Sequence, residues 1–180
     1  MMPGHAVYFY EDDAFLIENV AQFVKSGLDR QETVIVVATE EHRLDLKSRL
    51  IADNVIGLSS PADARYFTLD AASTLSLFML DEWPDERLFL KVMAQIISST
   101  AQQTPVRIYG EMVAVLWAQG KHRAAIRLEE LWNALARLQD FSLLCGYPAS
   151  AVEQPALASA LQEVCACHSQ VTGRRMPGIA

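Results

Sequence analysis

Acidic, aromatic and glycine residues stand directly after the apolar runs of this sequence, and they are the residues best suited to ligand binding or proton transfer. These residues are Tyr10, Glu11, Thr39, Glu40, Asp70, Gly110, Glu111, Gly146 and Tyr147. Glu111 is the most notable, because Gly110 allows a close backbone approach and the following segment, Met112–Leu116, is wholly apolar. We therefore expect a partly buried carboxylate at Glu111, which could contact a ligand or act as a general base.

Several of these positions have a simpler structural explanation. Glu11, Glu40 and Asp70 would each fall at the start of a helix, where the helix dipole favours an anion. Tyr147, which precedes a proline, fits a turn as well as a hydroxyl directed into a pocket. A structural role is the favoured explanation for the three acids, and both explanations stay open for Tyr147 and Glu111.

The histidines and cysteines near the chain ends are expected to be structural. His5 and His168 lie at the first strand and the last helix, and a satisfied hydrogen bond explains each better than ligand binding does. Cys165 and Cys167 precede His168, but residues two apart on a helix point about 200° away from each other. We therefore expect no metal site in this motif.

The sequence lacks the motifs of common nucleotide and hydrolase sites. Gly120-Lys121 is followed by His122, and Val115 stands where a phosphate loop needs its first glycine. No Gly-x-Gly-x-x-Gly, Gly-x-Ser-x-Gly or His-Glu-x-x-His segment occurs. Acidic residues follow the first apolar run, where they would repel a polyphosphate. We therefore expect neither NAD nor ATP nor a metal as cofactor.

Runs that favour strands alternate with helical patterns along the chain. The expected strands are 6–10, 33–38, 65–69, 105–109 and 141–145. The expected helices include 71–80, one capped by Asp85, two separated by Gly120, and one over 153–167. Trp117 and Trp132 fall on apolar helix faces and are expected in the core. This alternation predicts an α/β fold in three layers, with a mostly parallel central sheet and helices on both faces. Ligand sites of such sheets form outside the carboxyl ends of the strands.

Length, charge and cysteine content narrow the class of protein. The chain has 180 residues and a formal net charge of −7, which fits one domain over residues 1–171 and a mobile tail at 172–180. It is not basic enough to follow a phosphate backbone, so we expect no nucleic-acid partner. We find neither a secretory signal nor a membrane-spanning apolar stretch, and the three cysteines are too few and odd in number for a disulfide framework. These features favour a cytoplasmic protein.

Six short segments, taken in this order, carry a resemblance to a known family. They are His5–Asp13, Val106–Met112, Leu116–Trp117 with Gly120, Leu128–Asn133, Phe141–Pro148 and Val164–Ser169. Together they resemble the MEDS domain, the sensory module named after methanogens, methylotrophs and the regulator DcmR. The resemblance covers the chain from His5 to about Val171.

The resemblance implies a non-catalytic sensor of small, hydrocarbon-derived ligands, built on a RecA-like α/β core that has lost its phosphate loop. Members of the family are often joined to kinase or DNA-binding modules, for which this chain has no room. The resemblance therefore implies a separate signalling protein as partner, or self-association as a homodimer. Its matching positions, with Met112 added as an apolar wall, give these candidate ligand-binding residues: His5, Tyr10, Glu11, Gly110, Glu111, Met112, Cys145, Tyr147 and His168.

We therefore predict a stand-alone bacterial sensory module with a pocket at the carboxyl edge of the sheet, where Glu11 and Glu111 set the polarity. A second hypothesis is a degenerate nucleotide-binding enzyme in which Glu111 is the general base and His5 or His168 the acid. A third is a scaffold that binds another signalling protein and no small molecule. A cavity at the strand ends would favour the sensor over the scaffold.

Overall fold

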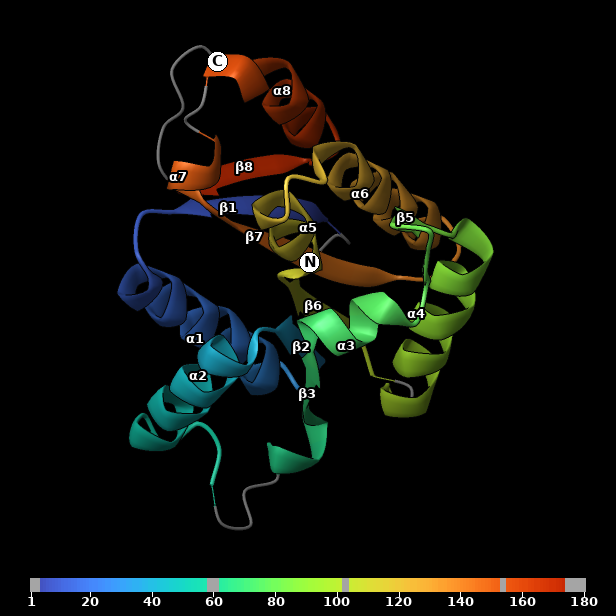
Figure 1. Ribbon diagram of the computed structural model, residues 1–180. Coiled ribbons are helices and arrows are strands. Elements are labelled where there is room, and N and C mark those ends of the chain that lie inside the picture. The colour runs from blue at the N-terminus through green and yellow to red at the C-terminus, as the bar shows by residue number, and fades with distance from the viewer. Residues whose placement is uncertain (1–3, 58–61, 102–103, 153–154, 174–180) are drawn as a thin grey trace.

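The centre of the protein is a six-stranded, all-parallel sheet (Figure 1), seen in a computed structural model that describes residues 4–57, 62–101, 104–152 and 155–173. Across the sheet the strands run in the order β3-β2-β6-β7-β1-β8. Their bounds are β1 His5–Tyr10, β2 Thr33–Ala38, β3 Tyr66–Asp70, β6 Val106–Gly110, β7 Phe141–Pro148 and β8 Gln170–Gly173. A separate antiparallel pair consists of β4 Met79–Leu80 and β5 Trp83–Pro84.

Helices cover both faces of this sheet and complete three layers. One face carries α1 Asp13–Asp29 and α2 Glu40–Ala52. The other face carries α3 Ala71–Ser76, α4 Glu86–Thr100, α5 Met112–Ala118, α6 His122–Ala136 and α8 Ala158–Ala166. We call them the α1/α2 face and the α5/α6 face. The short elements η1 Asp63–Arg65, α7 Ala149–Val152 and η2 Pro155–Leu157 lie in connections. The predicted α/β architecture is confirmed.

The side chains of each strand divide between two cores. All six residues of β2 are buried, as its continuous apolar sequence predicts for a strand covered on both faces. Val34 and Val36 belong to the core under α1 and α2, whereas Ile35 and Val37 belong to the core under the opposite helices. Trp132 lies in this second, larger core, where its ring meets those of Phe89 and Phe141 edge-on.

Polar caps at the carboxyl ends of the strands start the helices. The side chains of Asp12, Thr39, Asp70 and Asp85 accept hydrogen bonds from the backbone N–H groups that open α1, α2, α3 and α4. Each cap satisfies an amide that has no partner within the helix. The structural explanation for Asp70 and the predicted cap at Asp85 are thereby confirmed.

The chain differs from the sequence prediction in three places. The sixth strand, β8, was missed because it is a short edge strand of exposed residues. It includes Thr172 and Gly173, which we had assigned to the mobile tail. The rest of that tail, 174–180, lies outside the described residues. The helix expected at 71–80 ends at Ser76 and gives way to β4. The helix expected at 153–167 begins only at Ala158, after Pro155, which lacks the amide hydrogen of a helix interior; residues 153–154 lie outside the described part.

Within the described ranges, none of the helices combines the length and the apolar character that crossing a bilayer requires.

Candidate functional site

The buried carboxylate of Glu111 is the centre of a hydrogen-bonded group at the carboxyl end of β6. Glu111 follows β6 directly and is only 2% exposed. Its Oε1 accepts a hydrogen bond from the Tyr109 hydroxyl at 2.8 Å and lies 2.7 Å from Nδ1 of His42. Its Oε2 accepts from the backbone N–H of Thr39 at 2.9 Å. The carboxylate thus joins the end of β6 to the beginning of α2.

His42 connects this carboxylate to α1. Its Nε2 lies 3.3 Å from Oδ1 of Asp13, so the imidazole stands between two carboxylates, with the Tyr10 ring edge-on to it. The hydrogen bond to Glu111 raises the pKa of His42 to about 8, burial opposes that rise, and Asp13 adds to it. Burial, reinforced by Glu111 and Asp13, raises the pKa of Tyr10. At neutral pH the group therefore contains an imidazolium and a protonated phenol.

A small cavity of about 170 Å³ opens beside this group, at the ends of four strands. Its lining residues are Tyr10, Thr39, His42, Glu111, Ala114, Val115, Ala118 and Pro148. We call it the Glu111 pocket. Polar groups occupy the side formed by the strand ends and α2, and small apolar side chains of α5 form the opposite wall. No lysine or arginine is among the described lining residues, and the imidazolium of His42 is already paired with Glu111 and Asp13, so the lining offers no free cation to a polyphosphate.

The sequence-predicted residues divide between this pocket and other places. Tyr10 and Glu111 line it. Glu11 is exposed beside the cap of α1, and Met112 is buried in the core of the α5/α6 face. Gly110 does not provide the close approach that we expected, because a Cβ built there would meet no atom within 4 Å.

The close approach occurs at Gly146 instead. A Cβ at this position would lie 2.5 Å from the hydroxyl oxygen and 3.2 Å from ring atoms of Tyr109. The absence of a side chain at Gly146 therefore lets the Tyr109 ring lie against the neighbouring strand β7 while its hydroxyl donates to Glu111.

The remaining candidates, His5, Cys145, Tyr147 and His168, gather on the α5/α6 face around Glu129 of α6. The Tyr147 hydroxyl donates to Oε1 of Glu129 at 2.8 Å, and Nε2 of His5 lies 3.2 Å from Oε2. Burial raises the pKa of Glu129, but the neighbouring His168 and His5 outweigh burial and lower it overall. Glu129, with these four residues, is called the Glu129 cluster below, and its side chains include atoms able to bind a metal.

Sequence reasoning missed four residues of these two groups. They are Asp13, His42, Tyr109 and Glu129. Only Glu129 carried a usable signal, because it stands four residues after Ala125 and three before Trp132, both buried, and so lies on the buried face of α6. A carboxylate in such a position requires polar partners.

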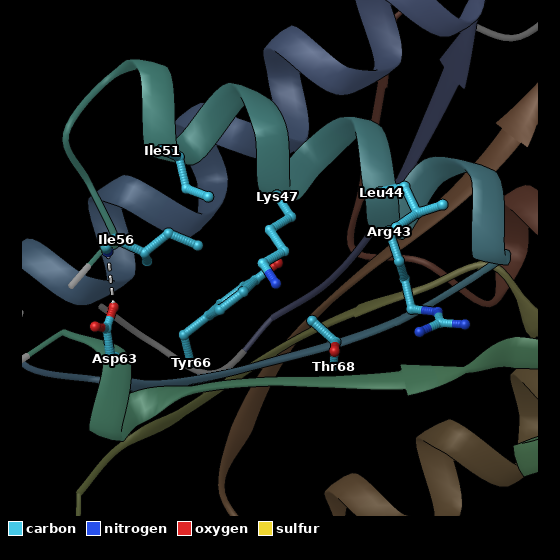
Figure 2. A pocket seen from close by; sticks show the side chains of 9 residues that line it. Arg43, Leu44, Lys47, Ile51, Ile56, Asp63, Tyr66 and Thr68 are labelled. Carbon is cyan, nitrogen blue, oxygen red and sulfur yellow. Dashed lines mark hydrogen bonds between the residues drawn. The ribbon is translucent and has the colours of Figure 1, made fainter. Parts of the chain in front are cut away.

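A third feature is a groove of about 740 Å³ between α2 and the edge strand β3. Figure 2 shows Arg43, Lys47 and Ile51 of α2 above Tyr66 and Thr68 of β3. None of the sequence-predicted site residues lines this groove.

Comparison with known proteins gives one match. A search of curated proteins finds no match. A family model described as MEDS, MEthanogen/methylotroph, DcmR Sensory domain, matches residues 4–169, nearly the whole chain. The chain therefore belongs to the MEDS family of sensory domains.

Proposed function

We propose that this MEDS domain binds a small neutral molecule in the Glu111 pocket and passes the binding event to a separate signalling protein. The observation that carries the proposal is the cavity itself, which lies where β1, β2, β6 and β7 end. Open parallel sheets bind their ligands at this edge. A cavity at this place also favours a sensor over a scaffold that binds no small molecule.

The volume of the pocket favours a small ligand. An engineered apolar cavity of about 150 Å³ in another protein holds one benzene molecule, and the Glu111 pocket has about 170 Å³. Sites for drug-sized molecules occupy about 300–1,000 Å³. The pocket therefore suits a molecule of benzene size or slightly larger, and it is too small for a nucleotide.

The lining favours an apolar body with one hydrogen-bonding group. Ala114, Val115 and Pro148 supply the apolar contacts. The carboxylate of Glu111 is already held by three donors. Tyr10 lines the pocket and burial raises the pKa of its phenol, so its hydroxyl keeps its proton, and it is the group we assign to the polar end of the ligand.

Helix α2 is the element that we expect to carry the response outward. His42 on its first turn touches the pocket network, whereas Leu44 and Ile51 on the same helix are exposed beside the groove of Figure 2. A ligand that favours one position of α2 would change the surface offered to a partner.

Two further assignments belong to the proposal. The three cysteines are all unpaired, which agrees with a reducing compartment, and we propose the cytoplasm.

We also propose that the domain is not an enzyme. The enzyme hypothesis needs His5 or His168 as the acid that serves Glu111, but both histidines contact Glu129 on the opposite face of the sheet. ATP with magnesium should give no heat of binding in calorimetric titration, and binding tighter than millimolar would restore the enzyme hypothesis.

Protein-observed NMR tests the ligand site with benzene, phenol and isobutanol as probes. We expect the amide signals of Ala114, Val115 and His42 to shift on addition of a probe. The variant Ala114→Leu fills the pocket and should abolish these shifts.

The variant Ala134→Leu provides a matched control, because Ala134 is also half-buried on a helix but does not line the pocket. It should bind the probes as the natural chain does. Shifts that persist in Ala114→Leu, or that concentrate at Leu44 and Ile51, would move the ligand site out of the Glu111 pocket.

A further inference from the structure

Four side chains of the Glu129 cluster direct metal-binding atoms towards one point. They are His5 of β1, Glu129 of α6, Cys145 of β7 and His168 just after α8. The side chains of Glu129, Cys145 and His168 are fully buried, and His5 is 8% exposed. One atom of each lies within 4.8 Å of those of the other three. Residues from both ends of the chain thus meet at one place in the core.

The distances within this group approach those of a tetrahedral site. Nε2 of His5 lies 3.2 Å from Oε2 of Glu129 and 3.4 Å from Sγ of Cys145. The same Oε2 lies 3.4 Å from Sγ of Cys145 and 3.4 Å from Nε2 of His168. Zinc bonds of about 2.0–2.3 Å place tetrahedral ligand atoms about 3.3–3.7 Å apart. The remaining pairs of ligand atoms lie within 4.8 Å of one another, so a zinc ion would fit after side-chain movements of about one ångström.

Both imidazoles are oriented as metal ligands. The side-chain N–H of Asn133 donates to the Cys167 carbonyl at 2.8 Å, so its Oδ1 is the atom that accepts from Nδ1 of His5 at 3.0 Å. Nδ1 of His168 donates to the Val164 carbonyl at 2.6 Å. In its neutral form each ring would therefore carry its hydrogen on Nδ1 and offer the lone pair of Nε2 to the cluster. Metal-binding histidines use this arrangement, with the other ring nitrogen held by an outer acceptor.

One nitrogen of the cluster lacks a hydrogen bond. Nε2 of His168 is buried and has no hydrogen-bond partner in the part of the chain that the structure describes, although Oε2 of Glu129 lies nearby. A buried polar atom without a partner is costly. A metal ion would satisfy it, and one carboxylate, one thiolate and two neutral imidazoles would balance the two charges of the ion.

We propose that His5, Glu129, Cys145 and His168 bind one zinc ion in a closed tetrahedral site. Four protein ligands leave no open position, so the site is structural and holds β1, β7, α6 and the end of α8 together. The Tyr147 hydroxyl holds the other oxygen of Glu129 and leaves Oε2 for the metal. A cavity of about 400 Å³, lined in part by His5 and His168, gives the ion a route from solvent. This site is separate from the Glu111 pocket, and its presence does not depend on the proposed function.

Metal binding to the full chain tests the proposal directly. After treatment with EDTA, the protein should take up one equivalent of Co²⁺ with the visible absorption of tetrahedral cobalt and a sulfur-to-cobalt charge-transfer band. Zn²⁺ should displace the cobalt and raise the melting temperature. X-ray absorption of the zinc-loaded protein should show one sulfur at about 2.3 Å and three lighter atoms at about 2.0–2.1 Å.

Three variants test the thiolate ligand, a control cysteine and the group behind His5. Cys145→Ser should lose the charge-transfer band, whereas Cys165→Ser, the control at a half-buried cysteine outside the ligand set, should keep it. Asn133→Ala, which removes the acceptor behind His5, should weaken metal binding by about 10- to 100-fold.

Three results would each overturn the proposal. They are a charge-transfer band that survives in Cys145→Ser, a zinc coordination shell without sulfur, and failure of the natural chain to bind either metal. The last two measurements use the natural chain, so they decide the question even where a variant does not fold.

Discussion

Raising the pH should remove the charge of His42 and weaken the contact between α1, α2 and the end of β6. The pKa of His42 is raised from 6.5 to about 8, first by the hydrogen bond to Glu111. A raised pKa stabilises the folded state fully below the unfolded value of about 6.5, and this stabilisation is lost as the pH rises through about 8. The difference between the two values corresponds to about 2 kcal/mol. Because Asp13 is exposed and solvent screens its contact, we expect a loss of about 1 kcal/mol.

The other titratable groups that face His42 keep their protonation state over this pH range. Asp13 approaches from α1, Glu111 from the end of β6, and Tyr10 from β1. Tyr10 and Tyr109 hold their protons throughout this pH range, since burial and then the nearby carboxylate of Glu111 raise the pKa of both phenols. The pH change therefore acts on the imidazolium and not on the phenols.

Urea unfolding at about pH 6 and about pH 9 measures the effect. Between the two pH values, the free energy of unfolding of the natural chain should fall by about 1 kcal/mol more than that of His42→Gln. NMR of the imidazole ring protons should give a midpoint near 8, whereas His122→Gln, which removes a different helix histidine, should leave both results unchanged. Equal losses in the natural chain and His42→Gln, or a midpoint below 6.5, would refute the assignment of His42 as a charged bridge.

Two core positions, Gly146 and Trp132, and one position on the exposed edge strand, Gly173, give further predictions that denaturant unfolding and hydrogen exchange can check. Gly146→Ala should lower the free energy of unfolding by about 1–3 kcal/mol because its Cβ would displace Tyr109. The control Gly110→Ala should change that free energy by less than about 0.5 kcal/mol. Equal effects of the two substitutions would contradict this prediction. Trp132→Ala should lower the free energy of unfolding by about 3–5 kcal/mol. A decrease below about 1 kcal/mol would mean that neighbouring side chains fill the cavity left by the indole ring. Gly173→Ala should release β8 and speed amide exchange there, because φ is +92° and a Cβ would run into a backbone carbonyl of β1; unchanged exchange would show that β8 tolerates the side chain.

The fold could be predicted because local patterns determine its elements. Alternating strands and helices gave the architecture, and the unbroken apolar run of β2 indicated a strand with helices on both faces. β8 has four exposed residues and pairs only at the edge, so it carries no such pattern. Its place depends on pairing with β1, which lies more than a hundred residues earlier in the chain.

The Glu111 pocket was only half predictable for the same reason. Tyr10 and Glu111 were found because each stands at the end of an apolar strand. His42 reaches Glu111 only because β2 and β6 are neighbours in the sheet, and the order of strands cannot be read from the sequence. The close approach was predicted for Gly110, but of these two glycines it is Gly146 that lies against a large side chain of the adjacent strand.

The position of β1 between β7 and β8 has a consequence for synthesis of the protein. In the described part of the chain β1 pairs with residues 141–148 and 170–173, so both of its edges stay uncovered until those residues have left the ribosome. Until then its backbone groups can pair with other strands, as any exposed edge can. Contacts so distant in sequence slow folding, and a nascent chain halted before residue 141 would present β1 as an unpaired, aggregation-prone strand.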